Sequence, residues 1–158
     1  MTQLTFMMGE FHAKFPIDRL YATNHMWGQV TDEGANDTQL TTIRFGFTAY
    51  AVRLLQDVYF LDWTVDCPAT LREKQQIGGI ESKKAESDLF APIAGRISKI
   101  NEELLSDPST INVDKYGQGW LFEIEGSTHS LMTAEGYLEH LTGVWEITQR
   151  TIKGQLNE

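Results

Sequence analysis

The sequence has a single cysteine, Cys67, among its 158 residues, so no internal disulfide can form. One free thiol is typical of a reducing compartment, whereas small secreted domains are often rich in disulfides. No apolar run approaches the roughly 18 residues that a membrane-spanning helix needs. The N-terminus also lacks the basic start and small-residue cleavage site of a signal peptide. These absences predict a cytoplasmic protein without a membrane partner.

Basic residues are also scarce, because 13 lysines and arginines stand against 22 acidic residues and give a formal charge of −9. A nucleic-acid-binding domain usually presents a basic face, and none is visible here. The acidic balance instead favours solubility and docking to basic proteins. With 41% hydrophobic residues, the chain can bury a core, which predicts one domain over residues 1–158.

Motifs for independent catalysis or metal binding are missing. The sequence contains no HExxH, GxSxG or phosphate-binding GxxxxGK[ST] pattern, and its four histidines lack the spacing of metal ligands. Cys67 has no evident neighbouring base. We therefore predict neither an enzyme nor a metal protein. His25, two residues before Trp27, is either a structural histidine or part of a cleft.

The hydrophobic pattern predicts short strands and a few helices. Thr48 is a candidate N-cap for a short helix, and Leu89, Ile93 and Ile97 would share one face of a strand. Strands are expected over 25–31, 41–47, 57–63, 77–82, 88–100 and around 120–124, with a turn over 32–37, a helical turn over 101–105 and a C-terminal helix over about 133–152. This order predicts a mostly β sandwich or barrel with appended helices.

The stretch ESKKAESD, residues 81–88, lies at the expected tip of a hairpin. It has no Asn-Gly, Asp-Gly or similar turn signal, and instead presents two adjacent lysines among acidic residues. A solvated cluster of mixed charges is one interpretation. The other is a lysine displayed for covalent modification, since its long stem and acylatable amine suit a swinging arm.

This stretch resembles the lipoyl-lysine site of the glycine cleavage H protein family, whose pattern is ESxKAxSD followed by a small residue-Pro-xx-Gly strand. It stands here as Glu81-Ser82-Lys83-Lys84-Ala85-Glu86-Ser87-Asp88, then Ala91-Pro92 and Gly95. The resemblance selects Lys84 over Lys83 as the attachment point of lipoate. It also implies that a lipoate ligase or other lipoylating enzyme reads Glu81, Ala85, Asp88 and Gly95.

Further motifs extend the resemblance over about residues 21–137. They are His25-x-Trp27, Gly46-Phe47-Thr48-Ala49-Tyr50-Ala51, and Asn112 with Tyr116, Gly117, Gly119 and Trp120. The implied fold is a lipoyl-domain-like barrel-sandwich with Lys84 on an exposed hairpin, and His25 could line the surface on which the arm rests. Biotin carriers resemble the chain less, because their hairpin displays Met-Lys-Met.

The chain departs from the family pattern at several positions. The usual His-Glu-Trp is His25-Met26-Trp27, and the usual Leu-Gly-Asp/Glu is Leu55-Gln56-Asp57. The missing glutamate removes a carboxylate that would pair with a cationic cargo. These departures resemble the lipoate-binding proteins of bacterial sulfur oxidation, which work with a heterodisulfide-reductase-like complex.

Three functional hypotheses follow. The one that the resemblance of these departures favours is a lipoyl carrier of sulfur oxidation. The second is the H protein of the glycine cleavage system, whose partners are glycine decarboxylase, aminomethyltransferase and dihydrolipoamide dehydrogenase. The third is an interaction module in which Lys84 stays unmodified.

Overall fold

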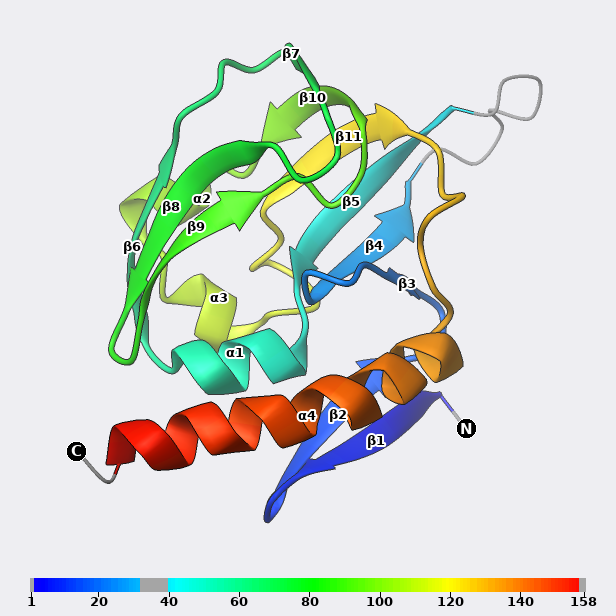
Figure 1. Cartoon of the computed structure of the whole chain (residues 1–158). Coiled ribbons are helices and arrows are strands. Elements are labelled where there is room, and N and C mark those ends of the chain that lie inside the picture. The colour runs from blue at the N-terminus through cyan, green and yellow to red at the C-terminus, as the bar shows by residue number, and fades with distance from the viewer. Residues whose placement is uncertain (1, 32–39, 157–158) are drawn as a thin grey trace.

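The computed structural model describes residues 2–31 and 40–156 and shows β sheets flanked by helices (Figure 1). The larger sheet has six strands in the order β3 (Leu20–Tyr21), β4 (Met26–Val30), β5 (Thr41–Phe47), β11 (Phe122–Gly126), β10 (Gly95–Ile100) and β7 (Ala69–Leu71). A second sheet has the order β6 (Val58–Trp63), β8 (Gln76–Ser82) and β9 (Glu86–Phe90). The predicted turn over 32–37 lies outside the described residues.

The two sheets share one hydrophobic core. Leu61, Ile80 and Leu89 come from the smaller sheet and pack in the same cluster as Phe45 and Ile97 of the larger one. All five side chains are buried, as expected for the inward-facing positions of a two-layer β structure. The predicted mostly β fold is therefore confirmed, and it is a sandwich: within the described residues the sheets do not close into one barrel.

A second core lies below the sandwich, between the N-terminal hairpin and the helices. The hairpin consists of β1 (Gln3–Met8) and β2 (Phe11–Pro16), and the helices are α1 (Ala49–Leu55) and α4 (Ala134–Leu156). Phe6 makes edge-on ring contacts with both Tyr50 and Trp145, so it joins β1, α1 and α4. The N-terminal hairpin and α4 therefore pack onto the same face of the molecule (Figure 1).

Helix starts agree with the capping signals in the sequence. The Thr48 hydroxyl accepts a hydrogen bond from the Ala51 N–H at 3.4 Å and begins α1. Likewise, the Thr133 hydroxyl accepts from the Gly136 N–H at 3.1 Å at the start of α4. Helix α4 continues to Leu156, beyond the predicted end near 152.

The single strand predicted over 88–100 is wrong. The segment divides into β9 and β10, which belong to different sheets. Pro92 lies in the break, where it has no N–H to continue a ladder, and the bond just before it runs from the Ala91 N–H to the Gln75 carbonyl at 2.8 Å. Leu89, Ile93 and Ile97 are all buried, so the predicted burial holds although the strand does not.

Other local expectations need smaller corrections. The helical turn predicted over 101–105 is α2 (Glu103–Ser106), and a second short helix, α3 (Thr110–Val113), follows it unpredicted. Trp120 precedes β11 instead of lying in it, and its ring is covered by the Arg44 guanidinium at 4.2 Å.

Candidate functional site

The hairpin between β8 and β9 ends in a tight turn whose two corner residues are Lys83 and Lys84. The Ser82 N–H donates to the Ala85 carbonyl at 2.8 Å, and the Ser82 hydroxyl accepts from the Ala85 N–H at 3.2 Å. No residue of this turn has a positive φ, which explains why no glycine or asparagine is needed. Both lysines are exposed at the tip of the hairpin.

The two lysines differ in how their backbones are held. The Lys83 N–H donates to the Asp57 carbonyl at 2.8 Å, which ties the turn to the link between α1 and β6. Neither lysine side chain makes an ion pair with any described residue. The Lys84 amine is therefore open to an acylating enzyme, and the site fits a group attached through an amide.

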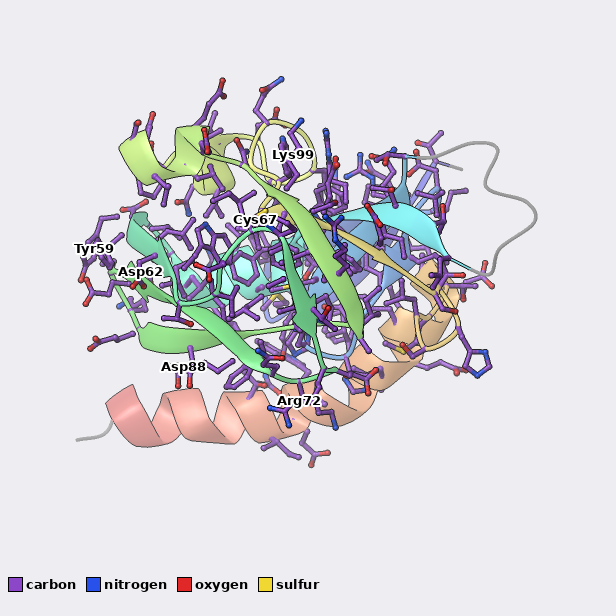
Figure 2. The ribbon with its side chains drawn as sticks, turned by 90° about the horizontal axis from the view of Figure 1, so that it is seen from above. Tyr59, Asp62, Cys67, Arg72, Asp88 and Lys99 are labelled. Carbon is purple, nitrogen blue, oxygen red and sulfur yellow. The ribbon has the colours of Figure 1, made fainter. Side chains whose placement is uncertain are left out.

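Carboxylates cover the outward face of the sheet next to this turn. Glu81 stands directly opposite Glu86, while Asp88 and Asp62 flank Gly79 in the next cross-strand row. Desolvation, followed by the nearby carboxylates of Glu86 and Asp62, raises the pKa of Glu81. Asp62 and Tyr59 extend from β6 at this end of the molecule, and Asp88 extends on the side nearer α4 (Figure 2). The face is acidic and suits a basic partner.

Three of the predicted recognition residues gather around Lys84, and Gly95 does not. Glu81, Ala85 and Asp88 all belong to the hairpin. Gly95 begins β10 in the other sheet, where it pairs with Gly126 and Leu71. Gly95 is therefore constrained by its neighbours in the larger sheet and not by the lysine turn.

His25 lies away from the hairpin, among aromatic rings beneath the larger sheet. Its Nδ1 is 2.8 Å from the Tyr137 hydroxyl, which in turn is 3.0 Å from the Thr48 hydroxyl. The ring centroid is 4.6 Å from that of Tyr50 and 6.1 Å from that of His140. Burial, and to a smaller degree His140, lowers the pKa of His25 to about 4. These contacts describe a structural histidine that links β4, α1 and α4.

We expect this histidine to make the protein sensitive to acid. Its pKa is about 4 when folded and near 6.5 when unfolded, so its stabilising effect is complete above pH 6.5 and is lost as the pH falls toward 4. His25→Asn removes the titration and tolerates the φ of 68° at this position. Between pH 7 and pH 4.5 the variant should lose about 2 kcal/mol less unfolding free energy than the wild type.

Urea unfolding at several pH values measures this difference, with the exposed His129→Asn as the control. An unchanged pH dependence in His25→Asn would show that His25 is not the group responsible.

A cavity of about 560 Å³ lies beyond the end of β9, and its lining includes Asn24, Lys74 and Phe90. The Asn24 Nδ2 donates to the Phe90 carbonyl at 3.0 Å, while its Oδ1 is buried without a partner among the described residues. His25 does not line this cavity. In the part of the chain that the structure describes, no group of three metal-ligating side chains occurs. Within the same residues, no helix has the length and apolarity to cross a membrane.

The glycine cleavage H-protein family model matches residues 19–143, which include the whole lysine turn. The chain belongs to this family. It is 35% identical over 136 residues to the glycine cleavage system H protein of Mycolicibacterium vanbaalenii, covering 82% of this chain and 98% of the relative. It is 38% identical over 126 residues to the H protein of Neisseria meningitidis serogroup B, covering 77% and 92%.

A solved structure of this family has the same fold. The glycine cleavage system H protein from Mycobacterium marinum matches with a TM-score of 0.67 and 33% identity, over 82% of this chain and 98% of that one. Membership confirms the predicted class of protein, a lipoate-carrying component that is not itself an enzyme. The reported relatives are named for glycine cleavage, so they support the second functional hypothesis over sulfur oxidation.

The residues that hold the turn were not among the predicted site residues. Ser82 and Asn112 belong to the recognised motifs, but nothing in a local pattern shows what their side chains bond. Residue 112 is 54 positions from Val58, which it contacts. Only the folded structure brings such partners together.

Proposed function

We propose that the protein is a lipoyl carrier with lipoate attached to Lys84 through an amide. The observation that carries this proposal is the exposed, unpaired Lys84 at the corner of a turn that belongs to the matched family region. Glu81, Ala85 and Asp88 supply the turn shape and negative charge that the lipoylating enzyme would read.

When bound, lipoate supplies a vicinal dithiol that undergoes thiol–disulfide exchange and can hold a cargo. The chain's own residues present and orient it. Ser82 and Ala85 fix the turn, and the Asp57 carbonyl holds Lys83. Amide formation removes the charge of Lys84 and leaves Lys83 cationic beside the carboxylates. The acidic face then offers a docking surface to partner enzymes, with electrostatic steering toward basic ones.

The pathway we propose is glycine cleavage in the cytoplasm, with the arm carrying an aminomethyl group. Its partners would be glycine decarboxylase, aminomethyltransferase and dihydrolipoamide dehydrogenase. The names of the similar proteins, and the large share of each chain that the similarity covers, support this pathway.

Sulfur oxidation with a heterodisulfide-reductase-like complex is a second candidate, favoured by one observation. Met26 stands where the family motif has glutamate, and its side chain is buried in the sandwich core. Its sulfur lies 3.8 Å from the Asn24 Nδ2 and offers no charge to a cationic cargo. A carrier that does not handle an amine has no need of a carboxylate at this position.

A glycine–bicarbonate exchange assay separates the two candidates. It uses the protein after lipoylation, confirmed by intact mass, together with a glycine decarboxylase of known activity. Exchange at a rate within about tenfold of a genuine H protein is expected, which corresponds to less than ~1.4 kcal/mol of lost transition-state stabilisation. Background exchange from fully lipoylated protein would overturn the glycine cleavage proposal, while a chain that accepts no lipoate would indicate an unmodified interaction module.

A further inference from the structure

The side chain of Asn112, on the short helix α3, forms hydrogen bonds with the link between α1 and β6 through both its amide oxygen and its amide nitrogen. Its Oδ1 accepts a hydrogen bond from the Val58 N–H at 2.9 Å, and its Nδ2 donates to the Gln56 carbonyl at 2.6 Å. Because one partner can only donate and the other can only accept, the orientation of the amide is determined. These two bonds hold the residues on either side of Asp57.

Asp57 is one of the residues that hold the lysine turn. Its carbonyl accepts the Lys83 N–H at 2.8 Å, one position before Lys84. A continuous series of hydrogen bonds therefore runs from α3 through residues 56–58 to the hairpin tip. The distant Asn112 side chain supports the backbone from which Lys84 projects.

The backbone of this link is strained at Gln56. Gln56 ends α1 with φ 62° and ψ −144°, a conformation that is almost restricted to glycine. Such conformations persist only where the surroundings hold them in place. The carbonyl of Gln56 itself is one of the two atoms that Asn112 binds.

Helix α3 is firmly anchored on its other sides. Ile111 is fully buried, and the loop that follows folds back so that the Asp114 carbonyl accepts from the N–H groups of both Gly117 and Gly119 at 3.1 and 2.9 Å. A side chain at Gly119 would lie 2.8 Å from the Thr110 carbonyl oxygen, so the loop packs tightly on the helix. Asn112 therefore projects from a rigid base.

We propose that Asn112 is a positioning residue for the lysine turn, which on the proposed function carries lipoate. By holding the strained Gln56–Val58 link, it keeps the Asp57 carbonyl in place for Lys83 and fixes how Lys84 is presented. A turn without this support samples several geometries, and each is a poorer substrate for an enzyme that must align one amine.

Amide hydrogen exchange of the unmodified protein tests this directly. In Asn112→Ala the Lys83 amide should exchange at least about tenfold faster than in the wild type. Loss of the two Asn112 hydrogen bonds should lower the free energy of local opening by at least ~1.4 kcal/mol. Ile124→Val, a core substitution in β11, is the control for general destabilisation. Its Lys83 exchange should change no more than that of its other slowly exchanging amides.

A rescue variant keeps the test decisive if Asn112→Ala folds poorly. Gln56→Gly removes the strain, so the double variant Gln56→Gly with Asn112→Ala should fold and recover part of the protection of the Lys83 amide. The same proteins are then offered to a lipoate ligase, and kcat/KM should fall several-fold in Asn112→Ala and rise again in the double variant.

Equal Lys83 exchange in Asn112→Ala and in the Ile124→Val control, after correction for global stability, would overturn the positioning role. This outcome does not depend on lipoate. If Lys83 exchange rises but Lys84 is never lipoylated in any variant, the proposed function fails and the support of the turn stands.

Discussion

Lys84→Arg is expected to abolish lipoylation, while Lys83→Arg is expected to be modified as fully as the wild type. The two side chains are adjacent, both exposed and of the same chemistry, so they form a matched pair. Arginine keeps the positive charge, but its guanidinium stays protonated and does not form the lipoyl amide. Because both substitutions lie at a solvent-exposed turn, unfolding free energies should change by less than about 0.5 kcal/mol.

Intact mass spectrometry after incubation with lipoate and a lipoate ligase measures the outcome. The wild type should gain one lipoyl group, Lys83→Arg one, and Lys84→Arg none. One lipoyl group on Lys84→Arg together with none on Lys83→Arg would assign the site to Lys83 and show that the motif alignment is off by one residue. No gain on any of the three proteins would favour the unmodified interaction module.

Local patterns predicted the elements whose burial alternates along the chain. The β5 strand, the Thr48 cap, the β8 strand and α4 all follow from periodicity and capping within a few residues. The N-terminal hairpin was missed, because its inner face is stabilised by partners far along the chain. Phe15, for example, packs edge-on against Tyr137. A two-stranded hairpin has little stability of its own, so its sequence carries a weak signal.

The candidate site likewise combines features that the sequence predicts with features that only the structure shows. Exposure and charge alone left open whether either lysine is functional, and the family motif was needed to single out Lys84. The support beneath the turn depends on contacts between segments distant in sequence, such as that of Asn112 with Gln56. His25 shows the converse case: its position two residues before Trp27 was compatible with a cleft, and only the structure shows its hydrogen bond with Tyr137.

Gly95→Ala is expected to destabilise the protein by about 3 kcal/mol, which for a chain of this size lowers the unfolding midpoint by roughly 10 °C. Gly95 has φ 153°, a conformation that side-chain-bearing residues rarely adopt. A Cβ there would overlap the Glu125 carbonyl oxygen and lie 2.8 Å from the Cγ2 of Ile124, which is fully buried. Neither neighbour is the free end of a flexible side chain, so the clash cannot be relieved locally.

Gly143→Ala is the matched control, because a Cβ at this position of α4 meets no atom within 4 Å. Alanine in a helix interior should raise stability by about 0.5–1 kcal/mol. Urea unfolding of both variants, followed by lipoylation at a temperature where both are folded, separates two explanations for the glycine of the motif. If Gly95→Ala is destabilised but lipoylated normally when folded, the glycine serves the sheet. If it is as stable as the wild type and resists lipoylation, the modifying enzyme reads this position directly, and the steric argument from Glu125 is wrong.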